Sequence, residues 1–244
     1  MNLTIPASSL ALLTLLTGTA LDPHPSSPHA STVPALQSAT LPLPPNYKTT
    51  FENPDILVMH VHYAAHEFVP MHDHSAYPTI YVYLSDSGVV EIRHEGPDGE
   101  VVKRPPTHTV AFRIAPGIAE RHSVTNLSDT DSDFLRVELK SIPPDDIKKV
   151  FRGEVKPLPY GTYTEYEDKA LRVERIICPP TGTCNPAEPV RSSLLIAINA
   201  SSIDKRKFNP GDVFLKPELT QIAKPGPILG TDGQFLRVTL LYSK

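Results

Sequence analysis

From about residue 50 onward, the sequence alternates between short runs rich in Val, Ile, Leu, Tyr and Phe and clusters of Gly, Pro, Asp or Ser. The runs before residue 141 are DILVMHVHYA, TIYVYLS, GVVEIRHE, HTVAFRIA and DFLRVELK. β-Branched and aromatic residues favour strands, and the intervening Gly and Pro favour tight turns. The segment EGPDGE at 95–100 predicts a hairpin tip, because Gly96 and Gly99 accept positive φ angles. The pattern predicts an all-β chain, folded as an antiparallel sandwich or barrel.

One segment departs from the strand pattern. PPDDIKKVFRG at 143–153 begins with Pro and Asp, continues with basic residues and ends at Gly, which is the asymmetry of a short helix. We therefore expect residues 143–164 to be a linker with a short helix. It would join a domain over residues 47–142 to a second domain over residues 165–244.

The second half of the chain repeats the first in a shortened form. DFLRVELK, which begins at Asp133, matches QFLRVTLL, which begins at Gln234, and PTIYVYLS resembles SSLLIAIN. Two related β units are the simplest explanation, and chance similarity among strand-forming segments is the alternative. The Phe-Leu-Arg-Val string shared by both halves favours duplication.

The N-terminus carries an apolar run, LALLTLLTGTA, that is too short to span a membrane and has the length of a signal-peptide core. Gly18 and Ala20 supply the small residues of a cleavage site, so residues 1–20 predict export to a secreted or periplasmic location. A disordered N-terminus is the alternative, since no Lys or Arg precedes the apolar run. Residues 21–46 are rich in Pro, Ser, Ala and Thr and are expected to form an extended linker.

The two cysteines, Cys178 and Cys184, lie close together in CPPTGTC. An oxidising compartment would favour a disulfide between them, and two free thiols at a hairpin are the alternative. Their spacing is not that of a CxxC redox motif.

The charge balance argues against one class of partner. The chain has a formal net charge of −4 and a pI near 6.2, without a basic excess. Nucleic acid, which is bound mainly through its phosphates, is therefore a poor candidate. The hydrophobic content of 40% is that of an ordinary globular protein.

Two histidines stand one residue apart in VPMHDHSAYPTIYVYLSDSG, at 69–88. Residues i and i+2 of a strand point to the same face, so His72 and His74 would aim both imidazoles at one point. A second segment, APGIAERHSVTN at 115–126, contributes His122 after a Pro-Gly turn.

These two segments resemble the paired motifs of the cupin superfamily. His72, His74, His122 and Asn126 match the family pattern position by position, and Gly117 supplies its turn, two residues further from the third His than usual. The resemblance implies a bicupin of two small antiparallel β-barrels, with a three-histidine metal site in the first. The second, over 165–244, contains no histidine and is expected to be degenerate.

The sequence also departs from the cupin pattern. Thr79, five residues after the second His, stands where the family usually has a metal-binding Glu. Three neutral imidazoles would bind one divalent transition metal such as Fe, Mn, Ni or Zn and would leave coordination positions open. Without a carboxylate ligand the ion keeps a charge near +2, which favours a small anionic chelating ligand. Solvated strand-edge histidines are the alternative.

Two functions fit such a site. The first is a metal-dependent oxidoreductase, resembling a dioxygenase, with a small organic acid, thiol or diketone as substrate. The second is a non-catalytic module that binds a small ligand or a sugar, since cupin architecture alone does not imply catalysis. The resemblance is also compatible with a homodimer formed through an edge strand.

Further residues are candidates for the surroundings of the metal. His60 and His62 share a strand face and would support a ligating imidazole if that face looks inward; a polar outer face is the alternative. Thr79 and Tyr81 are candidates for the pocket wall. Arg113 and Arg136 would bind a substrate carboxylate, and surface salt bridges are the commoner use of such arginines.

Overall fold

The described chain is built from antiparallel strands. The computed structural model describes residues 41–96, 99–153, 155–179, 193–199, 201–203, 206–215 and 233–241. The strands of the first half are β1 (Tyr47–Glu52), β2 (Ile56–Tyr63), β3 (Phe68–His74), β4 (Thr79–Tyr83), β5 (Val90–His94), β6 (Val101–Arg104), β7 (Phe112–Ala115), β8 (Glu120–Asn126), β9 (Ser132–Leu139) and β10 (Phe151–Arg152). Those of the second half are β11 (Gly161–Glu167), β12 (Leu171–Cys178), β13 (Ser193–Ala197), β14 (Ser201–Ile203), β15 (Arg206–Phe208), β16 (Val213–Leu215) and β17 (Gly233–Leu240).

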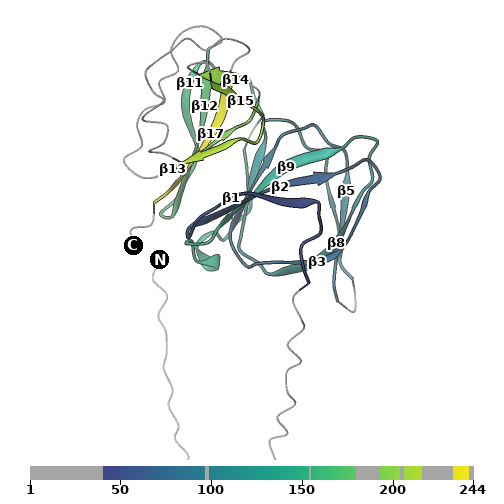
Figure 1. Cartoon of the computed structure of the whole chain (residues 1–244). Helices are drawn as coiled ribbons and strands as arrows, with labels where there is room; N and C mark the ends of the chain where they lie inside the picture. The colour runs from purple at the N-terminus through teal and green to yellow at the C-terminus, as the bar shows by residue number, and fades with distance from the viewer. Residues whose placement is uncertain are drawn as a thin grey trace, which may run out of the picture. The chain divides into compact units, whose positions relative to one another are not determined.

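The first half forms two sheets. A six-stranded sheet has the order β1-β2-β9-β4-β7-β10, and a four-stranded sheet has the order β3-β8-β5-β6 (Figure 1). The hairpin expected at 95–100 is confirmed, because β5 and β6 pair on either side of it and Gly99 has a φ of 45°. The all-β, antiparallel class is also confirmed. The hydrogen-bond ladders of the described residues form separate sheets, so the closed barrels expected from the resemblance are replaced here by a two-sheet sandwich.

The six-stranded sheet buries both of its faces. Residues alternate between the faces along each strand, and the central strands β2, β4 and β9 carry buried residues on both. One face joins the four-stranded sheet in a cluster made of Met59, Val61, Tyr63, Val69, Tyr83, Val90, Val124 and Phe134. The opposite face shares a larger cluster with the second half, which includes Val58, Ile80, Leu135, Val137, Leu171, Val173, Leu194 and Leu236. The space between the two sheets of the first half is therefore where a ligand site can form.

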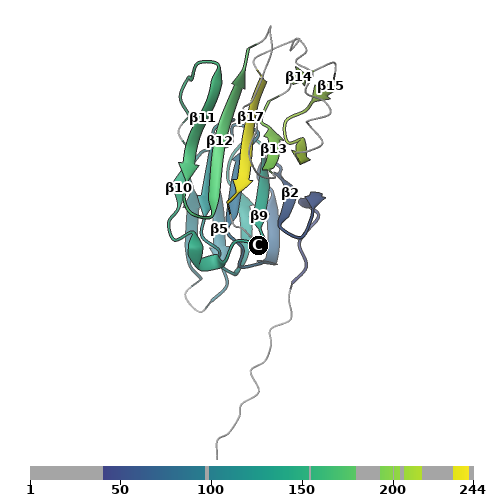
Figure 2. The ribbon, with the colours of Figure 1, turned by 90° about the vertical axis from the view of Figure 1, so that its left-hand side faces the viewer.

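The second half contributes a five-stranded sheet of order β11-β12-β17-β13-β16 and the two-stranded β14-β15 (Figures 1 and 2). The repeated Phe-Leu-Arg-Val string lies on β9 in the first half and on β17 in the second. β9 is flanked by β2 and β4, and β17 is flanked by β12 and β13, so the repeated string occupies corresponding inner strands. This correspondence supports duplication over chance similarity.

The helix expected within 143–153 is wrong. The described residues there form one 3-10 turn, Pro144–Asp146, after which Ile147 is extended and buried. Phe151 then starts the short strand β10, which pairs with the edge of β7, and its ring lies 5.7 Å from that of Phe112. Pairing with an open sheet edge and burial of an aromatic ring outweigh the local helical preference.

Several sequence-based expectations fall outside the described residues. These are the signal peptide over 1–20, most of the linker over 21–46, and Cys184. Cys178 ends β12 and is buried. The Cys178–Cys184 disulfide therefore stays a prediction. In the part of the chain that the structure describes, no helix has the length and apolar character needed to cross a membrane.

Candidate metal centre

Two neighbouring strands bring three histidines together. In the β3–β8 ladder His72 lies directly opposite His122, and His74 follows on the same face of β3. The ring centroids are 4.9 Å apart for His72 and His74, 4.9 Å for His72 and His122, and 5.0 Å for His74 and His122. All three side chains are buried. The structure thus gathers the histidines that the motif resemblance singles out.

The nitrogens of these rings are arranged as metal ligands would be. One ring nitrogen from each histidine lies within 4.8 Å of the other two. Both ring nitrogens of His74 and Nδ1 of His122 are buried without a hydrogen-bond partner. Nδ1 of His72 donates to the carbonyl of Pro70 at 2.7 Å, which leaves the lone pair on Nε2. Buried polar atoms without partners are costly, and a bound cation would take the lone pair of one nitrogen in each ring, so this donor set fits a divalent transition metal.

Burial keeps these imidazoles neutral. Desolvation lowers the pKa of His122 to about 3, helped by the positive charges of His72 and Arg136. It also lowers the pKa of His74 and His72, and Arg136 acts in the same direction on both. A metal must otherwise displace protons from its ligands, so near neutral pH the cluster is ready to bind.

Two tyrosines complete the histidine cluster on the side of the six-stranded sheet. The hydroxyls of Tyr47 and Tyr63 are 2.6 Å apart, and the Tyr47 hydroxyl lies 3.0 Å from Nε2 of His72. The Tyr47 ring centroid is 5.0 Å from that of His72 and 5.1 Å from that of His74. Burial raises the pKa of Tyr63 to about 12 and raises that of Tyr47 as well, so both hydroxyls stay protonated at neutral pH. Sequence reasoning missed this pair, because no motif marks them.

His94 and Glu120 flank the cluster and were also missed. His94 is the register partner of His122 across β5 and β8, with ring centroids 5.6 Å apart. Glu120 is the register partner of His74, and its Oε2 lies 3.7 Å from Nδ1 of His122, beyond hydrogen-bond distance. The signal available for Glu120 was alternation, since it precedes His122 by two residues on one strand face.

A cavity of about 240 Å³ opens beside the histidines, between the two sheets. Its lining combines titratable, cationic and aromatic side chains with aliphatic ones: Tyr47, Tyr63, His74, Tyr81, Tyr83, Val90, Ile92, His94, Val102, Arg104, Arg113, Glu120, His122, Val124, Phe134 and Arg136. A cavity of this kind suits a small organic molecule with a few polar groups.

Three of the residues proposed for the pocket do line it. Tyr81 is the register partner of both Arg113 and Arg136 in the six-stranded sheet. Arg136 is buried, donates to the Tyr81 hydroxyl at 2.7 Å and donates through Nε to Glu138 at 2.9 Å. The guanidinium of Arg113 lies 4.4 Å from the centroid of the Tyr81 ring. These arginines face the cavity and not the protein surface.

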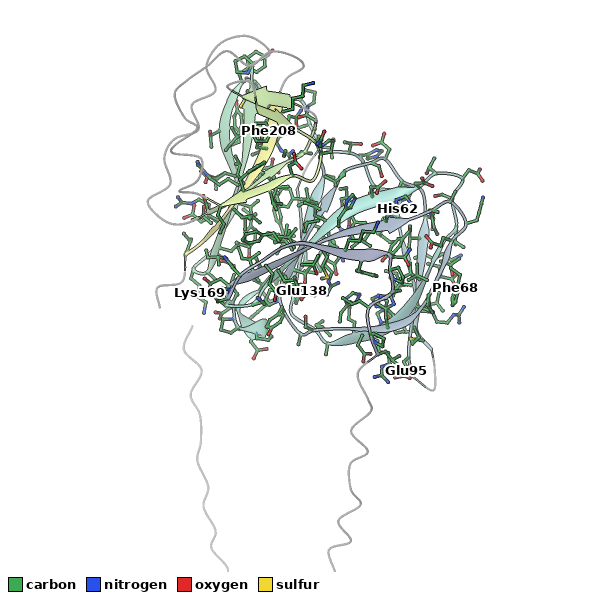
Figure 3. The ribbon with its side chains drawn as sticks, viewed as in Figure 1. His62, Phe68, Glu95, Glu138, Lys169 and Phe208 are labelled. Carbon is green, nitrogen blue, oxygen red and sulfur yellow. The ribbon has the colours of Figure 1, made fainter. Side chains whose placement is uncertain are left out.

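The structure places three other candidates away from the cavity. Thr79 is buried opposite Glu138, and its hydroxyl donates to the carbonyl of Tyr77 at 3.0 Å. His60 and His62 alternate with the inward residues of β2 and contact Asp133 Oδ1 at 3.2 and 2.9 Å. His62 is exposed (Figure 3). His60 and His62 were expected to support a ligating imidazole only if their strand face looked inward. That face looks away from the histidine cluster, so the geometry gives this role no support.

Asn126 and Gly117 occupy positions that explain their residue types. Asn126 is buried and hydrogen-bonds to Ala64 in the β2–β3 connection and to Ser128 and Thr130 in the β8–β9 connection. A Cβ at Gly117 would lie 2.6 Å from the carbonyl oxygen of Ala76 and 2.9 Å from Cα of Pro144. Only glycine allows this close approach of backbones beside the β7–β8 connection.

Comparisons with known proteins are informative at the level of structure. Neither a protein-family model nor a curated protein matches the sequence. A solved structure from Pseudomonas aeruginosa, named a glyoxylate-induced protein, matches 84% of this chain and 86% of its own with a TM-score of 0.52 and 12% identity. The pirin YhhW from Escherichia coli, in complex with nickel(II), matches 80% of this chain and 90% of its own with a TM-score of 0.50 and 13% identity. The chain has a cupin fold.

At these identities the likeness concerns the fold alone. The histidine cluster, formed by the HDH strand and its partner strand, fits a cupin metal site. At Thr79 the chain has threonine where the cupin motif pattern has a ligating glutamate. Its cluster is therefore built from imidazoles, and the nearest carboxylate among the cavity-lining residues is Glu120.

Proposed function

We propose that this cupin is an exported metalloprotein that binds one divalent transition metal through His72, His74 and His122. We propose further that it is a metal-dependent oxidoreductase of the dioxygenase type, with a small organic acid, thiol or diketone as substrate. The observation that carries the proposal is the group of three buried imidazoles, each with a ring nitrogen within 4.8 Å of the others, beside a cavity. The nickel(II) complex of the E. coli pirin supports a transition metal in this fold.

The bound metal would supply an electrophilic centre with open positions, on which a small chelating molecule and dioxygen could meet. The protein's own residues prepare that place. The bond from His72 to the Pro70 carbonyl fixes the imidazole tautomer, and Tyr47 carries a protonated hydroxyl 3.0 Å from the ligating nitrogen. When that nitrogen is occupied, the Tyr47 hydroxyl is free to donate to a bound ligand.

The walls of the cavity define how a ligand is held. Tyr83 and Phe134 and the aliphatic residues Ile92 and Val124 line it and limit access of water. Arg136 contributes positive charge opposite the histidines. This combination favours a small anion with an apolar body.

A second candidate is a binding module without turnover. It is favoured by the small number of proton acceptors: burial keeps Tyr47 and Tyr63 protonated, which leaves His94 and Glu120, the one carboxylate among the described cavity-lining residues. Export rests on residues 1–20 alone and is proposed from their composition.

Oxygen uptake separates the two candidates. The protein is loaded with Fe(II), Mn(II), Ni(II) or Zn(II), and oxygen consumption is recorded with a panel of small acids, thiols and diketones. An oxidoreductase consumes oxygen with at least one redox-active metal and one panel compound, and His74→Ala abolishes this. Saturable ligand binding without oxygen uptake for any metal would support the binding module instead.

A further inference from the structure

The cavity carries more positive charge than its surroundings neutralise. Three arginines and one carboxylate, Glu120, line it. Arg136 is paired with the carboxylate of Glu138 at 2.9 Å. Neither Arg104 nor Arg113 has an ion-pair partner among the described residues. An arginine stays charged in proteins, so each of these two groups needs another source of compensation.

Arg104 is the more buried of the two, with 8% of its surface exposed. Its Nη2 donates to the hydroxyls of Ser87 and Ser132 at 3.0 and 3.1 Å, and its guanidinium lies 5.5 Å from the Tyr83 ring centroid. Its Nε is buried without a hydrogen-bond partner. Neutral hydroxyls and an aromatic face hold the group in place without cancelling its charge.

Arg113 lines the cavity from β7 of the six-stranded sheet. Its guanidinium lies against the face of Tyr81, which leaves the N–H edge for another partner. Its Nε is also buried without a hydrogen-bond partner. The charge of Arg113 is among the causes that lower the pKa of Arg104, after burial, so the two arginines act on the same part of the cavity.

Arg113 and Arg136 lie on the six-stranded sheet, opposite the sheet that carries the histidines, and Arg104 lies on β6 of the histidine-bearing sheet. Arg113 and Arg136 are both register partners of Tyr81, and Arg136 lowers the pKa of all three histidines. Arg104 pairs with Val90, four residues along β5 from His94, a strand distance of about 13 Å. Both arginines and two of the histidines line the same cavity, so a molecule that fills it beside the histidines can reach the guanidinium groups of Arg113 and Arg104.

We infer that the cavity binds a small aromatic carboxylic acid, with its carboxylate on the N–H edge of Arg113, over the positive charge of Arg104, and its ring between the aromatic walls. The inference deepens the proposed function and rests on it in one respect, since contact between this ligand and a metal requires the proposed metal site. The carboxylate contact rests on Arg113 and Arg104 alone. Tyr63, Tyr83 and Phe134 supply the apolar surface for the ring.

The test compares acids with their neutral amides in titration calorimetry. The probes are benzoate with benzamide and 2-hydroxybenzoate with 2-hydroxybenzamide, and the protein is wild type, Arg113→Gln and the matched control Arg93→Gln. Arg93 is an exposed β5 residue, paired with Glu91 outside the cavity. We expect at least one acid to bind wild type and Arg93→Gln at least about tenfold more tightly than its amide, a preference of about 1.4 kcal/mol. Arg113→Gln should lose that preference, and Arg113→Lys should keep part of it, because lysine retains the charge without the planar fork.

Each outcome decides the inference. Equal affinity of acid and amide for wild type, the same preference in Arg113→Gln as in Arg93→Gln, or no binding of any acid overturns it. Each titration is repeated with metal-loaded and chelator-treated protein, so that a failure of the metal site is distinguished from a failure of the carboxylate contact. If the wild type takes up no metal but still prefers acids through Arg113, the metal proposal fails and this inference stands. If the wild type binds metal but shows no preference for acids over amides, this inference fails and the metal proposal stands.

Discussion

Replacing Asn126 tests the hydrogen bonds that hold two loops at the end of β8, the strand that carries His122. Its Nδ2 is 3.3 Å from the Tyr63 carbonyl, 3.0 Å from the Ala64 carbonyl and 2.9 Å from the Thr130 carbonyl. Its Oδ1 accepts from the backbone N–H and the hydroxyl of Ser128 at 3.1 and 2.7 Å. Asn126→Ala removes all of these bonds and leaves a buried pocket of carbonyls without a donor.

The loss can be estimated from the environment of each bond. The two N–H groups of the Asn126 side chain are shared among the three carbonyls, and its Oδ1 accepts from Ser128. At about 1 kcal/mol for each N–H and for the acceptor, we expect Asn126→Ala to lower the unfolding free energy by about 3 kcal/mol. For a chain of this size that corresponds to a fall in Tm of about 6 to 12 °C. Asn126→Asp should cost more, because a carboxylate oxygen would face the carbonyls.

The assay is thermal and urea unfolding followed by circular dichroism, on metal-free protein. Ser128→Ala is the control, since it removes one of the Asn126 contacts but keeps all three carbonyl partners satisfied; it should cost no more than about 1 kcal/mol. A Tm for Asn126→Ala within about 2 °C of wild type, well under the shift expected for this loss, would refute the reasoning. So would Asn126→Asp being more stable than Asn126→Ala at neutral pH.

Three further outcomes are expected. Folding lowers the pKa of His122 from its ordinary value to about 3, so between those pH values the unfolded state binds one more proton at this residue than the folded state. The stability of metal-free protein should therefore fall as pH drops from 6.5 toward 3, with a slope of up to about 1.4 kcal/mol per pH unit from this residue. His122→Gln should reduce the slope in urea titrations, and an unchanged slope would contradict the assignment. Gly117→Ala should lower the unfolding free energy by roughly 2 kcal/mol, because its Cβ would meet the Ala76 carbonyl, and wild-type stability in calorimetry would show that the backbone yields. Export predicts a mature N-terminus near Leu21 in mass spectra of protein from its native host, and an intact Met1 would count against it.

The histidine cluster was predictable because it depends on alternation and on a motif. Alternation aims His72 and His74 at one point, and the cupin pattern adds His122 from a distant segment. By contrast, Tyr47 meets His72 only because β1 reaches the cavity at the edge of the opposite sheet. Contacts across the space between two sheets leave no periodic signal in the sequence.

The face of a strand was harder to assign than its existence. Alternation shows that His60 and His62 share a face, but β2 is apolar on both faces, so the sequence does not tell which one looks at the metal. The segment 143–153 was misjudged for a related reason. Its local residues suit a helix, and the open edge of β7, which captures Phe151, is a tertiary feature.

The most direct test of the metal centre is elemental analysis of purified protein, prepared without chelators and incubated with divalent transition metals. Wild type should hold one equivalent per chain. His74→Ala and His122→Ala should each lose it, because two imidazoles bind far more weakly than three, and they should stay folded, because apolar packing between the sheets forms the core. His60→Ala, which removes an imidazole on the opposite strand face, should retain the full equivalent. A metal-free wild type, or a His122→Ala variant that keeps a full equivalent, would contradict the site.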